Sequence, residues 1–349
     1  MSEINMNQIE SKETEANQIK NNENELENSE YLKNYLSSCH LCPRNCGVNR
    51  LEGETGYCGT DAQVRAARAA LHMWEEPCIS GTEGSGAVFF SGCPLQCVFC
   101  QNHDIALAKA GSVISIERLA DIFLELQGQK ANNINLVTPT HYVPQIVCAL
   151  KLAKSRGLSI PIVYNTGSYE KAETLKMLEG LIDIYLPDCK YADAELAKEL
   201  SNAPDYFETA ISAIREMVRQ TGEPVFDERG MMQRGTIVRH LILPEHTRDS
   251  KQVIQKLYET FGDSIYISMM NQYTPMYQEQ TKDTIPMENR FLLKHPELNR
   301  KITKREYEKV IDYALDLGLV NGFTQEGKTA SESFIPQFDG EGIEQRIGV

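Results

Sequence analysis

Three cysteines that stand close together are the residues best placed to do chemistry. Cys93, Cys97 and Cys100 have the spacing C-x3-C-x2-C, with a glycine before the first and Phe99 before the last. Thiolates this close in a chain without an expected secretory signal usually bind a metal. Three ligands are one fewer than a structural zinc site or an electron-transfer cluster uses, so the spacing predicts a metal centre with an open position. The alternative is a chance group of buried cysteines.

Residues 91–102 resemble the cluster motif of the radical S-adenosylmethionine (radical SAM) superfamily, in which an aromatic residue precedes the third cysteine. The resemblance implies that Cys93, Cys97 and Cys100 hold a 4Fe-4S cluster whose open iron binds SAM. It also implies that an electron from the cluster cleaves SAM to methionine and a 5′-deoxyadenosyl radical. A flavodoxin or ferredoxin is then the expected electron donor.

The net charge and the distribution of apolar residues limit which partners and which cellular location the protein can have. The 349 residues carry a net charge of −14, which argues against nonspecific binding to nucleic acid or anionic membranes. The sequence has no apolar run long enough to span a bilayer and no basic start followed by an apolar segment. We therefore expect a cytoplasmic protein with no membrane span and no nucleic-acid partner.

A second group of cysteines precedes the first. Cys39, Cys42, Cys46 and Cys58 lie within twenty residues, among glycines and a proline that permit tight turns. Four thiolates can close a tetrahedral zinc site or hold a second iron–sulfur cluster, and the spacing leaves both alternatives open. We expect a disordered acidic tail over 1–30, a cysteine-rich metal-binding module over 31–80, a barrel over 81–323 and an extended tail over 324–349.

Apolar runs and amphipathic stretches alternate after residue 87. The expected strands are 87–90, 134–137, 160–164, 182–186, 236–243 and 265–269. The expected helices are 116–127, 143–155, 169–178, 194–200, 206–218, 251–261 and 304–317, the last one capped by Thr303. Continuous apolar strands alternating with helices predict an α/β fold with a parallel sheet. Six units predict a partial (β/α)6 TIM-like barrel, the architecture that the radical SAM resemblance also implies.

Polar residues follow the first two strands, at the rim where barrel enzymes place their chemistry. Asn102 belongs to a C-x-N-x-D continuation that resembles the glycyl-radical activating branch, and the resemblance implies that it contacts SAM. Loop capping is the alternative for Asn102. Thr138 and Thr140 stand where most radical SAM proteins have a Gly-Gly-Glu segment, and we expect their hydroxyl and carbonyl oxygens to accept from the SAM amino group.

The next three strand ends supply further candidates. Asn165 is placed to contact SAM, with ordinary turn capping as the alternative. Asp188 and Lys190 resemble the Asp-x-Lys pair of the activating enzymes and can share one face of an extended segment. Arg239 is expected to pair with the SAM carboxylate or a substrate, because its planar fork suits a carboxylate, or else to pair within the barrel wall.

Residues 135–142, together with the four-cysteine module, resemble a pyruvate formate-lyase activating-enzyme-like branch of the superfamily. The predicted function is therefore reductive cleavage of SAM, with activation of a glycyl radical enzyme as the more specific interpretation. Modification of another protein or a small molecule is the first alternative. A non-catalytic barrel in which both cysteine groups hold structural metals is the second.

Overall fold

The computed structural model describes residues 29–275, 294–325 and 336–344. Within these residues one sheet of ten strands has the order β10-β9-β8-β6-β5-β4-β2-β1-β3, with β7 paired to β8. Strands β2, β4, β5, β6, β8 and β9 are all parallel, whereas β1 is antiparallel to β2 and β3. Strand bounds are β1 Val64–His72, β2 Ser85–Phe90, β3 Ser112–Ile114, β4 Ile134–Val137, β5 Ile162–Thr166, β6 Ile184–Pro187, β7 Val225–Phe226, β8 Met232–Leu241, β9 Tyr266–Met270 and β10 Gly322–Phe323.

The parallel strands form the centre of the protein. Every residue of β2, β4, β5 and β6 is buried, because helices cover the outer face of the strands and the pocket described below fills part of the inner side. Helix bounds are α2 Pro77–Ser80, α3 His103–Ala106, α4 Ile116–Gly128, α5 Val143–Ser155, α6 Ala172–Lys176, α7 Ala194–Ser201, α8 Tyr206–Thr221, α9 Thr247–Phe261 and α11 Lys304–Asp316. Short 3-10 turns complete the connections.

Side-chain caps begin three of the outer helices. The Ser115 hydroxyl accepts from the Arg118 amide at the start of α4, and Asp193 caps α7 in the same way. Thr303 and Glu306 form a reciprocal capping box at the start of α11, as the predicted cap required. These caps satisfy amide groups that the first helical turn leaves without partners.

The predicted α/β fold with six strand–helix units is confirmed, and each expected strand and helix has a counterpart near the predicted bounds. Strand β1 was not expected. It continues the sheet from residue 64, inside the range predicted for the cysteine-rich module, so the module is joined to the barrel by a strand of the same sheet. The domain boundaries themselves remain predictions, and residues 1–28 of the expected tail lie outside the described residues.

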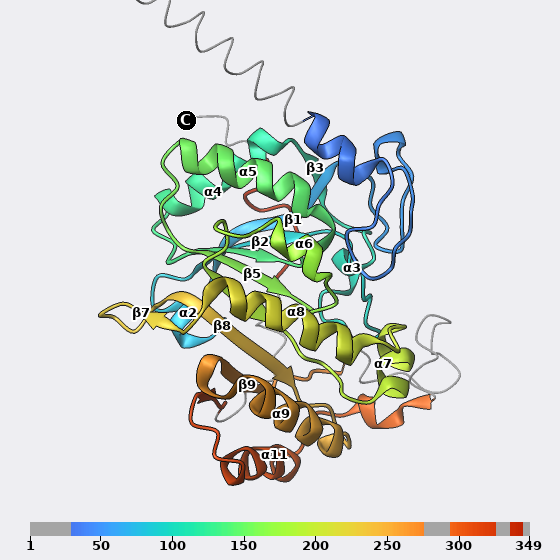
Figure 1. The fold of residues 1–349 in the computed structure, drawn as a ribbon, viewed down its shortest axis with the longest axis vertical. Coiled ribbons are helices and arrows are strands. Elements are labelled where there is room, and N and C mark those ends of the chain that lie inside the picture. Colours follow the sequence, from blue (N-terminus) through green and yellow to red (C-terminus); the bar gives the residue numbers. More distant parts are fainter. Residues whose placement is uncertain (1–28, 276–293, 326–335, 345–349) are drawn as a thin grey trace, which may run out of the picture.

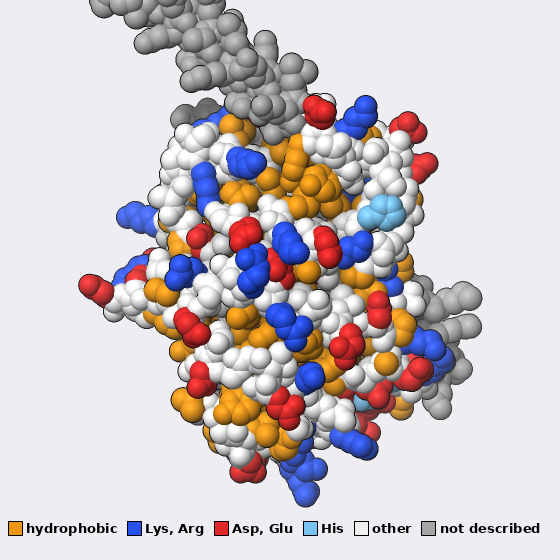
Figure 2. Space-filling view, in the orientation of Figure 1, with side chains coloured by type: hydrophobic (Ala, Val, Ile, Leu, Met, Phe, Trp, Pro, Cys, Tyr) orange, Lys and Arg blue, Asp and Glu red, His pale blue; other side chains and the backbone are white. Residues whose placement is uncertain are grey.

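Figure 1 shows the arrowheads of β5 and β8 pointing toward the side of the molecule that carries α3, α7 and the blue N-terminal segment. The carboxyl ends of the strands and the cysteine-rich segment therefore meet at one rim. No helix of the described residues is long and apolar enough to cross a membrane. The face in Figure 2 carries charged side chains of both signs, interspersed with small apolar areas.

The segment 336–344 lies against β1, near the edge of the sheet formed by β1 and β3. The Ala69 amide donates to Glu341 O over 2.8 Å, and the Gly340 amide donates to Ala67 O over 3.1 Å. The ring of Phe338 packs edge-on against Phe89 of β2. This segment covers backbone groups of β1 that would otherwise form an open sheet edge.

Candidate functional site

A pocket of about 250 Å³ opens at the carboxyl ends of the parallel strands. The three motif cysteines and all seven residues expected to contact SAM line it together. They are Cys93, Cys97, Cys100, Asn102, Thr138, Thr140, Asn165, Asp188, Lys190 and Arg239. They come from one loop and the ends of four different strands, so the fold rather than nearness in sequence brings them together.

The cysteine loop begins with a close backbone approach at Gly92. Its φ is +91°, and a Cβ there would lie 2.6 Å from Thr60 Cγ2 and 2.8 Å from Cys58 O. Only glycine fits such a place without strain. Further along the loop, burial and then the neighbouring Cys97 thiol raise the pKa of Cys93 to about 11. The same two causes raise the pKa of Cys100 to about 12, so the thiols are near enough to influence one another.

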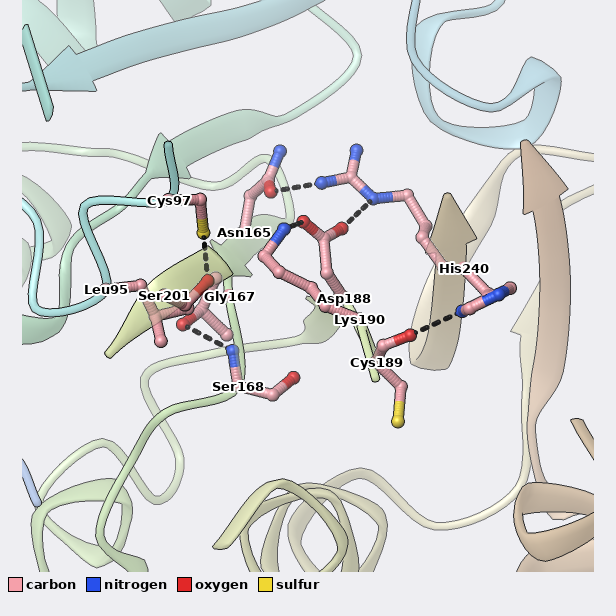
Figure 3. Close-up of polar contacts among 12 residues, drawn as sticks. Leu95, Cys97, Asn165, Gly167, Ser168, Asp188, Cys189, Lys190, Ser201 and His240 are labelled. Carbon is pink, nitrogen blue, oxygen red and sulfur yellow. Dashed lines mark hydrogen bonds and ion pairs between the residues drawn. The ribbon is translucent and has the colours of Figure 1, made fainter. Parts of the chain in front are cut away.

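A buried ionic network forms one wall of the pocket (Figure 3). Lys190 Nζ donates to Asp188 Oδ2 over 2.6 Å, and Arg239 Nε donates to Asp188 Oδ1 over 2.9 Å. Burial alone would raise the pKa of Asp188, but the two cations outweigh it and hold that pKa below its usual value. The Asp188 carboxylate in turn outweighs the burial of Lys190 and raises the pKa of its ammonium. All three groups are therefore charged near neutral pH.

Glu75 completes this network and was not predicted. Arg239 donates from NH1 to Glu75 Oε2 over 2.9 Å and from NH2 to Asn165 Oδ1 over 2.6 Å. The amide of Asn135 donates to Glu75 Oε1 over 3.0 Å. Glu75 follows β1 in a loop without a recognisable motif, so its acidic side chain was the only available signal. Three of the five N–H groups of Arg239 are used inside the wall, which leaves two for a ligand.

The end of β4 carries backbone strain. Thr138 has a φ of +59°, a left-handed conformation that β-branched residues rarely adopt. Gln96 in the cysteine loop and Ser168 after β5 also have positive φ values, of 47° and 64°. Thr138 itself lines the pocket, and Gln96 and Ser168 are chain neighbours of lining residues; backbone strain of this kind is typical of ligand-binding sites.

Glu170 lies behind the pocket and was also not predicted. It accepts from the hydroxyls of Thr140 over 2.6 Å, Thr166 over 2.5 Å and Tyr164 over 3.2 Å, all at Oε1. Burial raises the pKa of Glu170 to about 7, although these three donors lower it. Its other oxygen, Oε2, has no hydrogen-bond partner among the described residues. Glu170 thus fixes Thr140, one of the predicted contact residues, from behind.

Asn102 precedes α3 but does not cap it through its side chain. No side-chain capping hydrogen bond forms, although its carbonyl accepts from the Ala106 amide over 2.9 Å. The Asn102 side chain lines the pocket. Next to it, the Gln101 amide donates to Gln272 O over 3.0 Å, which joins the cysteine loop to the segment after β9.

A family model described as the radical SAM superfamily matches residues 87–257, which include the three cysteines and all seven predicted contact residues. Residues 87–257 of this chain therefore form a radical SAM domain. A relative named "Uncharacterized protein MJ0674", from Methanocaldococcus jannaschii, is 29% identical over 301 residues. These residues cover 82% of this chain and 78% of that protein.

Two solved structures resemble the fold at 15% sequence identity. Streptococcus suis SuiB bound to precursor peptide SuiA has a TM-score of 0.45 and covers 68% of this chain and 47% of SuiB. Methylornithine synthase (PylB) has a TM-score of 0.40 and covers 66% of this chain and 68% of that chain. The chain spans less than half the length of SuiB, and at these TM-scores neither structure carries an argument about its substrate.

Radical SAM proteins bind a 4Fe-4S cluster and SAM, and the spread of the motif thiols fits a cluster. Sulfurs that share one zinc ion lie about 3.8 Å apart, given Zn–S bonds near 2.3 Å. Among the described residues, one group of three His, Cys, Asp or Glu residues has its ligand atoms within 4.8 Å of one another. Cys93, Cys97 and Cys100 do not belong to that group. Wider separation is expected where each thiolate binds a different iron.

The N-terminal cysteines of this radical SAM protein lie directly behind the motif loop. Arg44, between Cys42 and Cys46, donates from Nε to Pro94 O over 2.8 Å and from NH2 to Ser201 O over 2.9 Å. Its guanidinium also stacks on Tyr57, 3.9 Å from the ring centroid. The Ser201 hydroxyl in turn contacts Cys97 Sγ over 3.0 Å, as Figure 3 shows. The module therefore supports the loop that carries the motif cysteines.

Three thiols of the module, Cys39, Cys42 and Cys58, are buried, whereas Cys46 is exposed. Burial, followed by the nearby Cys58 and Cys39 thiols, raises the pKa of Cys42 to about 12. These cysteines are also absent from the compact group of ligand atoms within 4.8 Å. The described thiols therefore leave both metals open.

A larger pocket, of about 500 Å³, lies at the opposite end of the strands. Residues before β8 and at the start of β9 line it, with Cys78 at its wall. Its lining holds few titratable groups, namely Glu83, Arg229, Tyr266 and Cys78, and no predicted site residue. Size alone does not mark the functional site here, because the smaller pocket combines convergent polar groups, charge and strain.

Proposed function

We propose that this protein cleaves SAM reductively and that Cys93, Cys97 and Cys100 hold the 4Fe-4S cluster. One observation carries the proposal: three thiols with an open-site ligand count share a single pocket with seven polar residues from four strand ends. A reduced cluster held by these thiolates would supply the one electron needed to cleave SAM to methionine and a 5′-deoxyadenosyl radical. A low-potential protein such as flavodoxin or ferredoxin is the proposed source of that electron.

The chain's own residues bind and orient SAM in this proposal. Asn102 and Thr140 offer polar groups beside the cysteine loop, and the Thr138 and Thr140 oxygens accept from the amino group. Lys190 and the two unused N–H groups of Arg239 present positive charge toward a carboxylate. Asp188 and Glu75 fix these cations, and Asn165 fixes the guanidinium plane through its 2.6 Å contact. Preorganised charge of this kind needs no rearrangement when the ligand binds.

The test is anaerobic reconstitution of the full chain with iron and sulfide, followed by dithionite and SAM. Mass spectrometry then measures 5′-deoxyadenosine. We expect product from the unaltered protein and from Cys78→Ala, a buried cysteine outside both groups, and none from Cys93→Ala. Absence of product together with absence of SAM binding, in a protein with a full reduced cluster, contradicts the proposal.

We also propose that the four N-terminal cysteines hold a second iron–sulfur cluster, with zinc as the alternative. Four thiolates suit either group, and the position of the module directly beside the motif loop is what leads us to propose a cluster. Iron and sulfide counts separate the two: about eight irons per chain support two clusters, whereas four irons with one zinc support the zinc site. Cys42→Ala should then remove only the metal bound by the module, either four irons or one zinc per chain, and leave the four irons at Cys93, Cys97 and Cys100.

The proposed reaction downstream is hydrogen abstraction from a protein, with glycyl-radical activation as the specific candidate. Trp74 is 56% exposed and lines the pocket, so an exposed aromatic side chain flanks the opening. An exposed indole of this kind can pack against the side chains of a protein substrate. EPR of the reduced protein mixed with SAM and a candidate glycyl radical enzyme tests this: deoxyadenosine without a glycyl radical signal rules out that enzyme as the partner.

A further inference from the structure

A second cluster of metal-ligating side chains lies outside the radical SAM pocket. His246 immediately precedes α9, and His295 and Glu297 belong to a short segment that precedes α11. One ligand atom from each of the three residues lies within 4.8 Å of the other two. His246 is about fifty positions away from His295 and Glu297 in the chain, so the fold brings it to them.

The distances match the edges of a tetrahedral site. Glu297 Oε1 lies 3.2 Å from His246 Nε2 and 3.0 Å from His295 Nδ1. Ligands held by a zinc ion with bonds of about 2.0–2.1 Å lie roughly 3.4 Å apart. One ligand atom from each residue lies within 4.8 Å of the other two, close enough for one ion to bind all three once the two imidazole nitrogens give up their contacts with Glu297 Oε1.

A carboxylate also stands behind one of the imidazoles. Glu199 of α7 has Oε2 3.0 Å from His295 Nε2, the ring nitrogen that faces away from Glu297. The His295 side chain is 10% exposed, yet this nitrogen has no aligned hydrogen bond within the described residues. Histidines that ligate metals usually direct their other nitrogen at a carboxylate, and Glu199, 45% exposed, has room to align.

We propose that His246, His295 and Glu297 form a zinc site, with water as the fourth ligand on the solvent side. Two imidazoles and one carboxylate are ligands that zinc accepts, and three protein ligands leave one position open. The site fastens the segment 294–299 to the rim of the barrel. That segment already meets the rim where the Tyr273 hydroxyl donates to Leu298 O over 2.7 Å. The proposal is independent of the SAM chemistry.

The test uses the full chain with its iron–sulfur clusters reconstituted first, so that the cysteines are occupied. One equivalent of zinc is added anaerobically, excess metal is removed, and bound zinc is measured by mass spectrometry and X-ray absorption. We expect about one zinc per chain with only nitrogen and oxygen neighbours near 2.0–2.1 Å, and no sulfur near 2.3 Å. We also expect zinc to raise the melting temperature of the chain.

Variants locate the zinc. His295→Ala and His246→Ala should each lose the bound zinc while iron content and circular dichroism stay unchanged. Glu199→Gln should keep the nitrogen and oxygen neighbours but weaken binding about tenfold, as removal of an outer carboxylate does elsewhere. Glu195→Gln is the matched control, since Glu195 lies one turn away on α7 and contacts Lys198. It should bind zinc as the unaltered chain does.

Three results overturn the proposal. They are a sulfur neighbour as the main zinc signal, no retained zinc in the unaltered chain, or zinc retained by both histidine variants. Should a histidine variant fail to fold, the absorption spectrum of the unaltered chain still decides, because sulfur and nitrogen neighbours differ in distance.

Discussion

Asp188 is the residue on which the charged wall of the pocket depends. Its carboxylate accepts from Lys190 over 2.6 Å and from Arg239 over 2.9 Å, and all three side chains are less than 20% exposed. Removal of one partner from a buried ionic group leaves a charge without compensation and costs about 3–5 kcal/mol. We predict that Asp188→Asn lowers the free energy of unfolding by about 3 kcal/mol and weakens SAM binding more than tenfold.

Denaturant unfolding and calorimetric titration with SAM measure the two effects of Asp188→Asn. The control is Glu195→Gln, which removes an exposed pair with Lys198 and should change stability by less than about 0.5 kcal/mol. Equal effects of the two substitutions would show that the buried network does not stabilise the pocket.

Glu170 gives the stability of the protein a pH dependence. Burial raises its pKa from 4.5 to about 7 in the folded chain, so the folded state holds a proton that the unfolded state releases. The contribution of this bound proton to the free energy of unfolding is fully present below pH 4.5. It is lost as the pH rises from 4.5 through 7, and the free energy of unfolding falls by roughly 3 kcal/mol. We predict that Glu170→Gln flattens this part of the stability profile, because an amide oxygen still accepts from Thr140, Thr166 and Tyr164.

Urea unfolding of both proteins between pH 5 and pH 8 checks the effect of Glu170. The difference in unfolding free energy should favour the glutamine variant increasingly toward pH 8. A constant difference across this range would mean that Glu170 does not titrate there.

The helix caps act at the scale of single elements. At the start of α11 the Thr303 hydroxyl accepts from the Glu306 amide over 3.2 Å, and the Thr303 amide donates to Glu306 Oε2 over 2.9 Å. Loss of such a cap costs about 1 kcal/mol. We predict that Thr303→Ala lowers the unfolding free energy by about 1 kcal/mol, as seen in chemical denaturation, and leaves cluster content unchanged. Thr303→Ser should recover most of the loss, since serine retains the hydroxyl.

The sequence predicted the parallel strands well because each is a continuous apolar run between amphipathic helices. It missed β1, because Arg65 and Arg68 break the apolar pattern and the alanines between them do not favour a strand. Glu75 and Glu170 were missed for a related reason. Each acts through neighbours from distant strands, so no local pattern marks either residue. Cys93, Cys97 and Cys100 could be predicted to share the pocket because their spacing is itself typical of a metal centre.

At the scale of the whole molecule, Arg44 links the two cysteine groups. It donates to the carbonyls of Pro94, Ser201 and Asn202 and thereby ties the N-terminal module to the motif loop and α7. Charge-assisted hydrogen bonds are stronger than neutral ones, and the planar guanidinium suits three acceptors. We predict that Arg44→Ala shortens the lifetime of the cluster at Cys93, Cys97 and Cys100 several-fold under a chelator.

Loss of the iron–sulfur absorption with time measures the lifetime in the Arg44 variants. Arg44→Lys should lie between alanine and arginine, because an ammonium cannot reach all three carbonyls with one geometry. If the cluster lifetime is unchanged in Arg44→Ala, the contacts of the module do not stabilise the motif loop.

The position of the segment 336–344 near the end of the sequence affects the order in which the pocket is assembled during translation. It contacts β1 through Ala67 and Ala69, some 270 residues earlier, and Pro336 lines the pocket. Every cysteine of both groups has therefore been synthesised long before this part of the pocket wall exists. Before residues 336–344 are in place, the pocket opening is wider than in the complete protein. We expect insertion of the iron–sulfur clusters to be fastest in that interval.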